Sequence, residues 1–341
     1  YGAERVGLLT GDNSINAEAP IVVMTTEVLR NMIYAQSASL PDLAHVVMDE
    51  VHYLADRSRG AVWEEVLIHL PDSVTITALS ATVSNAEEFG HWLGTVRGPT
   101  DVIVEEYRPV PLWQHVLVGQ HLHDLFVDDD QRQVNPELLH RAQDEARQER
   151  MQRGRGRPPR GGRRYRGSER VSRPSLVRRL DQANLLPAIS FIFSRAGCDA
   201  AVDQCLQAGI RLTSEGERTA IRDFAESACA RIDPRDLAAL GYDDWLYALE
   251  RGVAAHHAGQ VPLFKEVVET LFQLGLVRMV FATETLALGI NMPARSVVLE
   301  KLVKWNGENH VDLTPGEYTQ LTGRAGRRGI DVEGHAVVVW H

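Results

Sequence analysis

The chain has 341 residues, 44% of them hydrophobic, and a net charge of −10, which predicts two globular domains with a core in each. It contains no apolar run of about 18 residues and no signal-peptide pattern, so we expect a cytoplasmic protein that does not enter a membrane. Cys198, Cys205 and Cys229 form no CxxC pair, which argues against a disulfide framework or a zinc site and favours buried reduced thiols.

The first elements read as strands that lead into polar turns. Val6–Asp12 (VGLLTGD) predicts a strand and a turn, and Ile21–Met24 predicts a second buried strand. A helix is expected to open at Thr25 and run through Tyr34, with Thr26 as its N-cap. Helix N-termini and hydroxyl groups suit phosphates, and an ordinary capped strand and helix unit is the alternative.

The segment His45–His52 (HVVMDEVH) carries the clearest chemistry. Its apolar start is typical of a buried parallel strand, which places Asp49 and Glu50 at the strand's tip, where ligands bind in α/β sheets. Mg²⁺ keeps most of its waters and takes one or two protein carboxylates, which suits Asp49 as a metal ligand through water. Glu50 is then free to orient or deprotonate an attacking water. The alternative is that the two acids only start a helix.

The elements after this strand complete a first lobe. Val74–Leu79 predicts another buried strand with Ser80-Ala81-Thr82 at its tip, and Asp101–Glu105 predicts a further strand. Arg108–Pro111 (RPVP) suits a linker, so we place a first lobe at residues 1–110 and a second at 111–341.

A basic insertion is expected inside the second lobe at about residues 121–183. Residues 141–180 contain 14 Arg, no Lys and four acids, a local charge of +10, which leaves −20 for the rest of the chain. This composition cannot bury enough apolar surface to offset chain entropy, so we expect disorder. Its arginines suit capture of nucleic acid and Tyr165 suits stacking on a base, whereas a solvated linker is the alternative.

Strands that end in polar residues recur in the second lobe. Ala188–Phe193 predicts a strand that ends at Ser194-Arg195, and Val277–Phe281 predicts one that ends in ATETLALGINMP at 282–293. Between them stand His256 and His257, which have no Cys or acid at ligand spacing, so we reject a zinc site there.

The last helix is expected to place two arginines. It opens with Thr314 as N-cap, carries Gln320 and breaks at Gly323. Arg324 and Arg327 lie three residues apart among glycines, which allows both guanidinium groups to approach a γ-phosphate as arginine fingers. The alternative is a basic helix end favoured by the helix dipole.

The strings DEVH, SAT and QLTGRAGRR, in this order, resemble the superfamily 2 DExH-box helicases over nearly the whole chain. FSRAGC, HHAG and ATETLALGINMPA look most like the superkiller (Ski-type) RNA helicases, and a related DNA-repair helicase group shares much of this pattern. The resemblance implies an α/β fold of two RecA-like lobes with parallel sheets, with ATP and Mg²⁺ as cofactors.

The phosphate loop of that family is not in this sequence. The chain has three lysines, none preceded by Gly, so no GxxxxGK[ST] motif occurs. Helicases of this family carry the loop upstream of the region covered here. We therefore expect an incomplete first lobe, in an N-terminally truncated fragment that alone is inactive.

The resemblance also assigns roles to named residues. Those implied in catalysis are Asp49, Glu50, His52, Arg324 and Arg327. Ser80 and Thr82 couple the motifs, with His52 as the link to the metal site. Those implied in nucleotide binding are Gln320, Gly289, Gly323 and Asn291, which replaces the Asp of many relatives. Those implied in nucleic-acid binding are Thr10, Gly11, Asp12, Thr25, Thr26, Ser194, Arg195, Thr283 and Thr285.

The expected function is ATP-driven translocation along, and unwinding of, nucleic acid, with RNA favoured over single-stranded DNA by the resemblance alone. A noncatalytic nucleic-acid-binding remnant and a DNA-repair helicase are the alternatives. Nucleic-acid-stimulated ATPase activity separates the catalytic reading from the noncatalytic one. We expect a monomer without membrane contact.

Overall fold

A computed structural model describes residues 1–55, 60–80, 86–105, 107–144, 171–287, 290–305 and 308–340. Contacts between Cα atoms divide the chain into two compact units, Tyr1–Tyr107 and Arg108–His341, which are described separately below. None of the helices in the described ranges combines the length and the apolar character that crossing a membrane requires.

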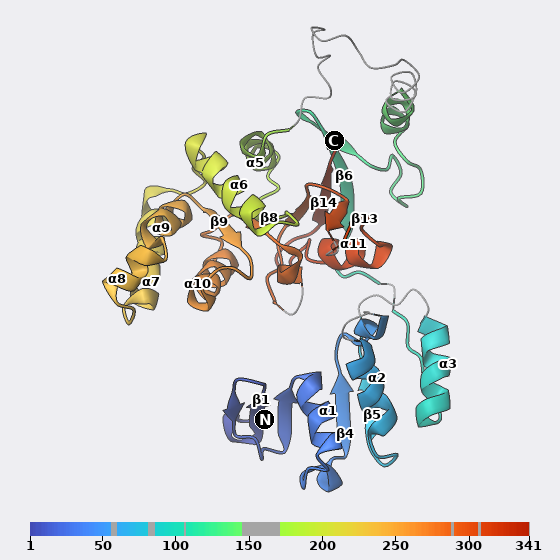
Figure 1. Ribbon diagram of the computed structural model, residues 1–341. Helices are drawn as coiled ribbons and strands as arrows, with labels where there is room; N and C mark the ends of the chain where they lie inside the picture. The colour runs from blue at the N-terminus through green and yellow to red at the C-terminus, as the bar shows by residue number, and fades with distance from the viewer. Residues whose placement is uncertain are drawn as a thin grey trace. The chain divides into compact units, whose positions relative to one another are not determined.

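Unit 1 is built from short parallel strands and the helices beside them (Figure 1). β1 runs parallel to β3, with β2 antiparallel at its other edge, and β4 runs parallel to β5. The elements are η1 (Ala3–Arg5), β1 (Val6–Leu9), β2 (Ser14–Ile15), β3 (Ile21–Met24), α1 (Thr26–Tyr34), η2 (Leu40–Asp42), β4 (His45–Met48), η3 (Val51–Ala55), α2 (Gly60–His69), β5 (Thr75–Ala78) and α3 (Ala86–Arg97).

The core of unit 1 forms where α2 meets β4 and β5. Val66 and Leu67 of α2 are fully buried and pack in one cluster with Val46 and Met48 of β4. At the end of α3, the guanidinium of Arg97 donates to the carbonyls of Leu70, Pro71 and Val74 at 2.6, 2.9 and 3.0 Å. This core fixes the strands whose ends carry the DEVH and SAT motifs.

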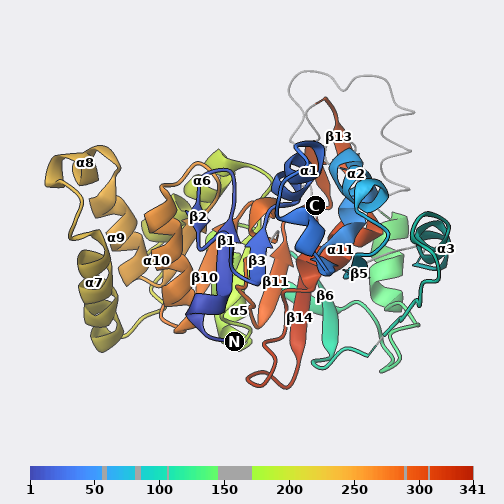
Figure 2. The ribbon, with the colours of Figure 1, turned by 90° about the horizontal axis from the view of Figure 1, so that it is seen from below.

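Unit 2 contains a seven-stranded sheet in the order β7-β6-β14-β11-β8-β10-β9, in which all neighbours are parallel except the edge strand β7. Figure 2 shows β6, β14, β11 and β10 in this order across the sheet. A separate antiparallel hairpin joins β12 and β13. Its strands are β6 (Leu112–Val118), β7 (His121–Asp124), β8 (Ala188–Phe191), β9 (Val253–His256), β10 (Met279–Ala282), β11 (Ser296–Leu299), β12 (Val303–Trp305), β13 (His310–Asp312) and β14 (Gly334–Val339). Its helices are α5 (Arg173–Gln182), α6 (Arg195–Gln207), α7 (Glu215–Cys229), α8 (Pro234–Ala239), α9 (Tyr242–Glu250), α10 (Pro262–Gln273), η4 (Glu284–Ala287) and α11 (Pro315–Thr322).

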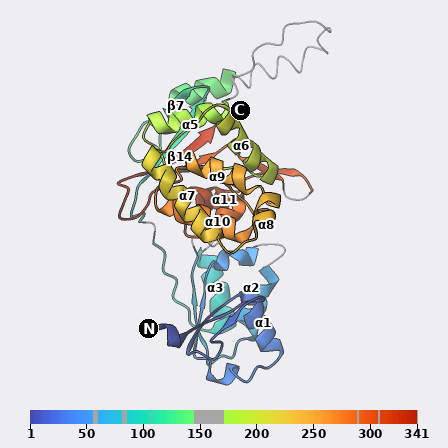
Figure 3. The same cartoon turned by 90° about the vertical axis from the view of Figure 1, so that its left-hand side faces the viewer.

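The sheet of unit 2 is covered on both faces, which explains its almost wholly apolar strands. Alternate strand residues, such as Phe281 and Val298, pack with α5 and α6, while the residues between them pack with α7, α9, α10 and α11. Figure 3 shows the helices of this second face, where α7 contacts both α9 and α10. Both units are thus α/β with parallel strands, and the predicted RecA-like fold class is confirmed.

Four local predictions were wrong. The strands β3, β4 and β5, which were predicted to be buried, expose alternate residues, and Val47 of β4 is 62% exposed. Residues 101–105 form no strand. The N-cap of α1 is Thr25, with Thr26 as the first helical residue. The insertion expected to be disordered from 121 to about 183 has structure at both ends, because β7 pairs with β6, residues 136–144 are helical with Leu138 buried, and α5 buries Leu176 and Leu180. Residues 145–170, which hold Tyr165, lie outside the described residues.

The three cysteines are buried and unpaired, as predicted. Burial raises the pKa of Cys198 and of Cys205 to about 12, so both stay thiols at neutral pH.

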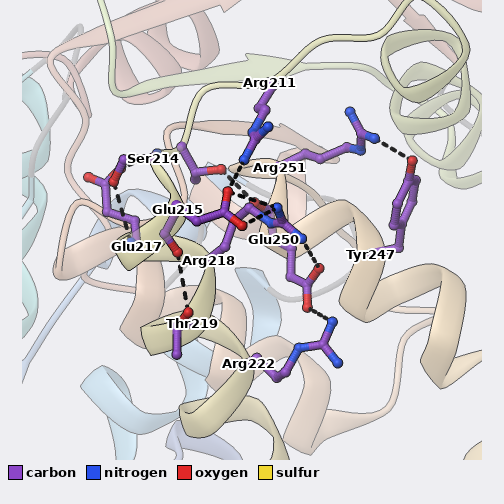
Figure 4. A network of polar contacts seen from close by, with 11 residues as sticks. Arg211, Ser214, Glu215, Glu217, Arg218, Thr219, Arg222, Tyr247, Glu250 and Arg251 are labelled. Atoms are coloured by element: carbon purple, nitrogen blue, oxygen red, sulfur yellow. Dashed lines mark hydrogen bonds and ion pairs between the residues drawn. The ribbon is translucent and has the colours of Figure 1, made fainter.

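A buried carboxylate ties α9 to α7 (Figure 4). The side chain of Glu250, 5% exposed, pairs with Arg222 at 2.5 Å and with Arg218 at 3.7 Å, while its carbonyl accepts a hydrogen bond from Thr213 Oγ1. Because each arginine of this cluster already has an acidic or phenolic partner, we assign the cluster a structural role.

Two stacked histidines connect β6, β7 and β14. His115 Nδ1 lies 2.8 Å from Asp124 Oδ1, and His115 Nε2 lies 3.0 Å from His335 Nδ1. Burial lowers the pKa of both imidazoles, that of His335 to about 4. The contacts fit two neutral rings, in which His335 Nδ1 donates to His115 and His115 Nδ1 donates to Asp124.

This pair predicts a loss of stability in mild acid. The folded pKa of His335 lies below its unfolded value of about 6.5, so its contribution is complete above that pH and is lost as the pH falls toward 4. His335→Asn keeps a donor near Nδ1 without titrating in that window. Urea unfolding measures how far the unfolding free energy falls between pH 7.5 and pH 4.5. This fall should be smaller in the variant than in the wild type by roughly 2 kcal/mol. Equal drops in both proteins would contradict the assignment.

Candidate functional site

The tip of β4 presents two carboxylates. Two backbone hydrogen bonds join the end of β4 to the end of β5. Leu79 N–H donates to Met48 O at 2.8 Å, and Val51 N–H donates to Leu79 O at 2.9 Å. Between these bonds Asp49 is exposed and Glu50 half-buried. The φ of Glu50 is +52°, a left-handed conformation that costs a non-glycine residue energy and turns the chain sharply.

His52 and Ser80 lie beside these acids. His52 Nδ1 is 3.2 Å from Glu50 Oε2, and its ring stacks on Tyr53 with the centroids 4.9 Å apart. Ser80 directly follows Leu79 and is exposed, so it stands at the same strand edge as Asp49. Thr82, its expected partner in coupling, lies outside the described residues.

The donor set fits Mg²⁺ better than a metal that needs a protein cage. Asp49 Oδ1 accepts the Glu50 N–H at 2.9 Å, which orients the carboxylate and leaves Oδ2 for a water of the ion's shell. Among the described residues no group of three or more His, Cys, Asp or Glu side chains could hold a metal. Mg²⁺ commonly takes one or two protein carboxylates and completes its shell with water and substrate phosphates.

The residues of unit 1 that are expected to contact a nucleic-acid strand also lie together at one edge of a β-sheet. The register pairs Leu9 with Met24, so Thr10 and Thr25 come directly after paired strand ends. Thr10 Oγ1 accepts the N–H of Asn13 at 3.0 Å and that of Asp12 at 3.4 Å, and Gly11 and Asp12 are exposed in this turn. The Thr25 side chain makes no cap hydrogen bond in α1, while Thr26 is half-buried.

A matching edge occurs in unit 2, where β8, β10 and β9 end together. Ser194 caps α6 by accepting the Gly197 N–H at 3.2 Å, and Arg195 beside it is exposed. Thr283, after β10, shares a hydrogen bond of 2.8 Å with Thr285 through their hydroxyl groups. These residues present hydroxyls, a helix N-terminus and a guanidinium at one edge, which suits a phosphate backbone.

The role of the two histidines at the end of β9, His256 within the strand and His257 directly after it, was missed from sequence. His257 Nε2 lies 2.9 Å from Asp199 Oδ1 of α6, and its Nδ1 accepts the Gly259 N–H at 3.1 Å. His256 Nε2 lies 2.8 Å from Glu269 Oε1 of α10. They clamp the end of β9 to helices on both sides, and their acidic partners are too distant in sequence for any spacing rule to find.

The expected nucleotide-contacting residues lie in two segments of unit 2. Asn291 is exposed, and its carbonyl accepts Gln273 Nε2 at 3.0 Å, while Gly289 lies outside the described residues. Gln320 is half-buried on α11, and Gly323 is the C-cap of that helix. Thr314 and Glu317 form a full capping box at its start, so the predicted N-cap is confirmed.

The loop after α11 is bonded to the segment that follows η4. Arg324 Nη1 donates to Ile290 O, Ala294 N–H donates to Arg324 O at 2.9 Å, and Gly326 N–H donates to Ala294 O at 2.8 Å. Arg108, which was not predicted, donates to Ala325 O at 2.5 Å and to Val110 O at 2.8 Å. The loop is therefore held by backbone contacts on two sides.

The two arginines of this loop differ in their contacts. Arg327 makes a two-pronged ion pair with Asp331, at 2.7 and 2.8 Å, and these hydrogen bonds raise its pKa. Asp331 is 4% exposed, so the pair is well shielded. Arg327 must leave Asp331 before it can reach a phosphate.

Residues 6–89 match the DEAD/DEAH box helicase family, and residues 237–329 match the helicase conserved C-terminal domain. The chain is 62% identical over 348 residues to a "Probable helicase HelY" of Mycobacterium leprae, and 41% identical over 343 residues to "Superkiller complex protein 2" of Homo sapiens. It is 40% identical over 385 residues to a chloroplastic "DExH-box ATP-dependent RNA helicase" of Arabidopsis thaliana.

These alignments cover 100%, 98% and 99% of the chain, but only 38%, 27% and 31% of the respective relatives. The two matched domains occur in the order that defines a helicase core, and the chain belongs to the DExH-box helicases. Its likeness to superkiller complex protein 2 confirms the predicted resemblance to the Ski-type group.

The loop at residues 323–328, called the arginine loop below, should depend on Gly326 for its stability. Its φ is +86°, and an added Cβ would stand 2.6 Å from Val110 Cγ1. Gly326→Ala should lower the unfolding free energy by about 2–3 kcal/mol, from backbone strain plus overpacking. Gly329→Ala is the matched control, since its φ of +77° carries the strain while its surroundings are open. Equal losses in both variants, measured by urea unfolding, would show that contact with Val110 contributes nothing.

Proposed function

We propose that this polypeptide contributes the core of an ATP-dependent helicase that moves along single-stranded RNA. Membership in the family supports helicase function, and the names of its relatives, including an "ATP-dependent RNA helicase", favour RNA over DNA. The chain spans 38% of the mycobacterial relatives it matches, so the activity is proposed for the full-length gene product that contains these residues.

The observation that carries the proposal is the position of Asp49 and Glu50 directly beyond the end of β4, a strand that is paired in parallel with β5 and buries Val46 and Met48. In the proposed reaction Asp49 holds Mg²⁺ through water and Glu50 orients and deprotonates the attacking water. His52 Nδ1 lies 3.2 Å from Glu50 Oε2, and the family resemblance is the basis for proposing His52, Ser80 and Thr82 as coupling residues. Bound Mg²⁺ supplies charge stabilisation at the phosphates.

Arg324 and Arg327 are the proposed partners of these acids across the bound nucleotide. Arg324 directly follows Gly323, the C-cap of α11, and Gln320 precedes Arg324 by about one helical turn. Gly289 and Asn291 are proposed nucleotide contacts on the neighbouring segment. A planar guanidinium that is always charged suits the charge that develops on a transferring phosphoryl group.

The bound nucleic-acid strand is proposed to contact the two β-sheet edges that present hydroxyl groups. In unit 1 its contacts are Thr10, Gly11, Asp12, Thr25 and Thr26. In unit 2 they are Ser194, Arg195, Thr283 and Thr285. A cytoplasmic location, a monomeric state and a boundary of the lobes at residue 110 stay predictions.

Residues 1–341 contain no GxxxxGK[ST] motif, so hydrolysis is expected only where such a loop is supplied. Strand binding, in contrast, is expected of the chain itself. A full-length gene product that binds RNA but does not hydrolyse ATP would favour the noncatalytic reading, and preferential unwinding of DNA would favour the DNA-repair reading.

The first prediction of the proposal concerns Glu50. In the full-length gene product, Glu50→Gln removes the base while it keeps the shape of the side chain, so the RNA-stimulated kcat for ATP should fall by at least about 100-fold. The KM for ATP and the Kd for RNA should change little. Glu64→Gln, an exposed acid of α2, is the control and should hydrolyse ATP normally. A Glu50→Gln enzyme with a kcat within tenfold of wild type would reject the assignment.

A second prediction concerns the Arg-rich segment. Residues 145–170 hold ten Arg and three acids, and replacing them with an uncharged linker of equal length leaves the buried helix α5 intact. If these arginines contact RNA, the slope of log K against log salt should flatten by at least about 2, since each neutralised phosphate of a single strand contributes roughly 0.7. Unchanged slopes would identify the segment as a solvated linker.

A further inference from the structure

Unit 2 contains an ion-pair cluster formed by residues of three different elements. Lys304 Nζ of β12 lies 2.7 Å from Glu284 Oε2 of η4 and 2.7 Å from Glu317 Oε1 of α11. The Lys304 side chain is 17% exposed, so the ammonium group sits largely out of water between the two carboxylates. None of the three residues is among the expected catalytic or binding residues.

Each carboxylate belongs to a segment with a proposed role. Glu284 stands between Thr283 and Thr285, whose hydroxyl groups are hydrogen-bonded, and Leu286 anchors the same 3-10 helix in the core with 1% exposure. Glu317 divides its two oxygens: Oε2 accepts from the N–H and hydroxyl of Thr314 in the capping box, and Oε1 contacts Lys304. Lys304 therefore bridges Glu284, in the segment proposed to contact the nucleic-acid strand, and the first turn of α11.

The charges make this bridge persistent at neutral pH. Burial opposes the charged form of Lys304, but the hydrogen bonds to Glu284 and Glu317 outweigh it, and the pKa of Lys304 is raised. The contact with Lys304 also helps to lower the pKa of Glu317 against the effect of its burial. Because the two carboxylates share one ammonium group, a movement of either carboxylate changes the contact of Lys304 with both.

The other end of α11 is fastened to the same segment. Arg324 donates to Ile290 O, and Ala294 exchanges backbone hydrogen bonds with the arginine loop, to Arg324 O and from Gly326 N–H. Helix α11 also contacts η4 directly. Glu284 is thus tied to the start of α11 through Lys304, and Ile290 and Ala294 are tied to the loop at its end, so that a displacement of these residues is expected to move α11 and the loop that carries Arg324.

We propose that Lys304 is a positioning residue that transmits strand binding at Thr283 and Thr285 to α11 and its arginines. The inference rests on the proposed function, since it takes the two threonines as strand contacts and Arg324 as a nucleotide contact. Lys304 itself acts only through Glu284 and Glu317. Its loss should leave both sites able to bind while removing the energetic coupling between them.

Hydrogen exchange of the α11 amides tests this coupling without any need for ATP. In the wild-type chain, saturating single-stranded RNA should slow amide exchange across residues 316–322 by about tenfold. In Lys304→Gln the Kd for RNA should stay within about threefold of wild type, while the slowing should fall below about twofold. Lys301→Gln is the matched control, because it removes the charge of an exposed lysine three residues earlier and should behave as wild type.

Two further variants separate coupling from a merely structural role. Lys304→Arg can contact both carboxylates and should restore the slowing, whereas Glu284→Gln leaves the Lys304–Glu317 pair in place and should lose it. If Lys304→Gln shows the full slowing on RNA binding, the inference is wrong and the proposed function stands. If the wild-type chain binds no single-stranded nucleic acid, the proposed function fails and the inference fails with it. If Glu284→Gln and Lys304→Gln both exchange faster without RNA yet are slowed normally by it, the cluster is structural only.

Discussion

Parallel pairing of strands that are buried on both faces is the constraint on which the rest of this structure depends. In unit 2 the alternating residues of each central strand pack against helices on opposite faces, so the strands are mostly apolar and most polar side chains follow the strand ends. Parallel register then brings those ends together: β8, β10 and β9 finish beside one another, as β1 and β3 do in unit 1. Hydroxyls, acids and guanidinium groups therefore collect at the carboxyl edges of the sheets, where α/β proteins bind ligands.

The same constraint explains why the candidate site needs so many supporting contacts. A strand tip fixes a Cα position but not a side chain, and each functional segment is oriented by polar contacts from elsewhere. Asp49 accepts the Glu50 N–H, the capping box positions the start of α11, and Asp331 holds Arg327. Lys304 joins two such segments through a single ammonium group. Binding at one edge can thus alter side-chain geometry at another without unfolding any strand.

The sequence predicted the features that periodicity and local chemistry control. The strands that carry Asp49, Ser194 and Thr283, and the Thr314 cap of α11, all occur as expected, because apolar runs and capping residues act over a few neighbours. What the sequence could not show depends on contacts between distant residues. The pairing of Lys304 with Glu284, of His257 with Asp199 and of Arg108 with Ala325 has no local signature. The prediction from composition made the disordered insertion too long, because β7 and α5 are ordered by their contacts with the sheet and core that they join.

The central proposal is that Glu50 activates the water that attacks bound ATP and that Arg324 contacts the phosphates of the nucleotide. The most direct test is a structure of the full-length gene product with Mg²⁺, a non-hydrolysable ATP analogue and single-stranded RNA. We predict that the Glu50 carboxylate lies within one water of the γ-phosphate, and that the Arg324 guanidinium donates to the same phosphate at about 3 Å. A bound nucleotide that one of these side chains does not approach would contradict the account.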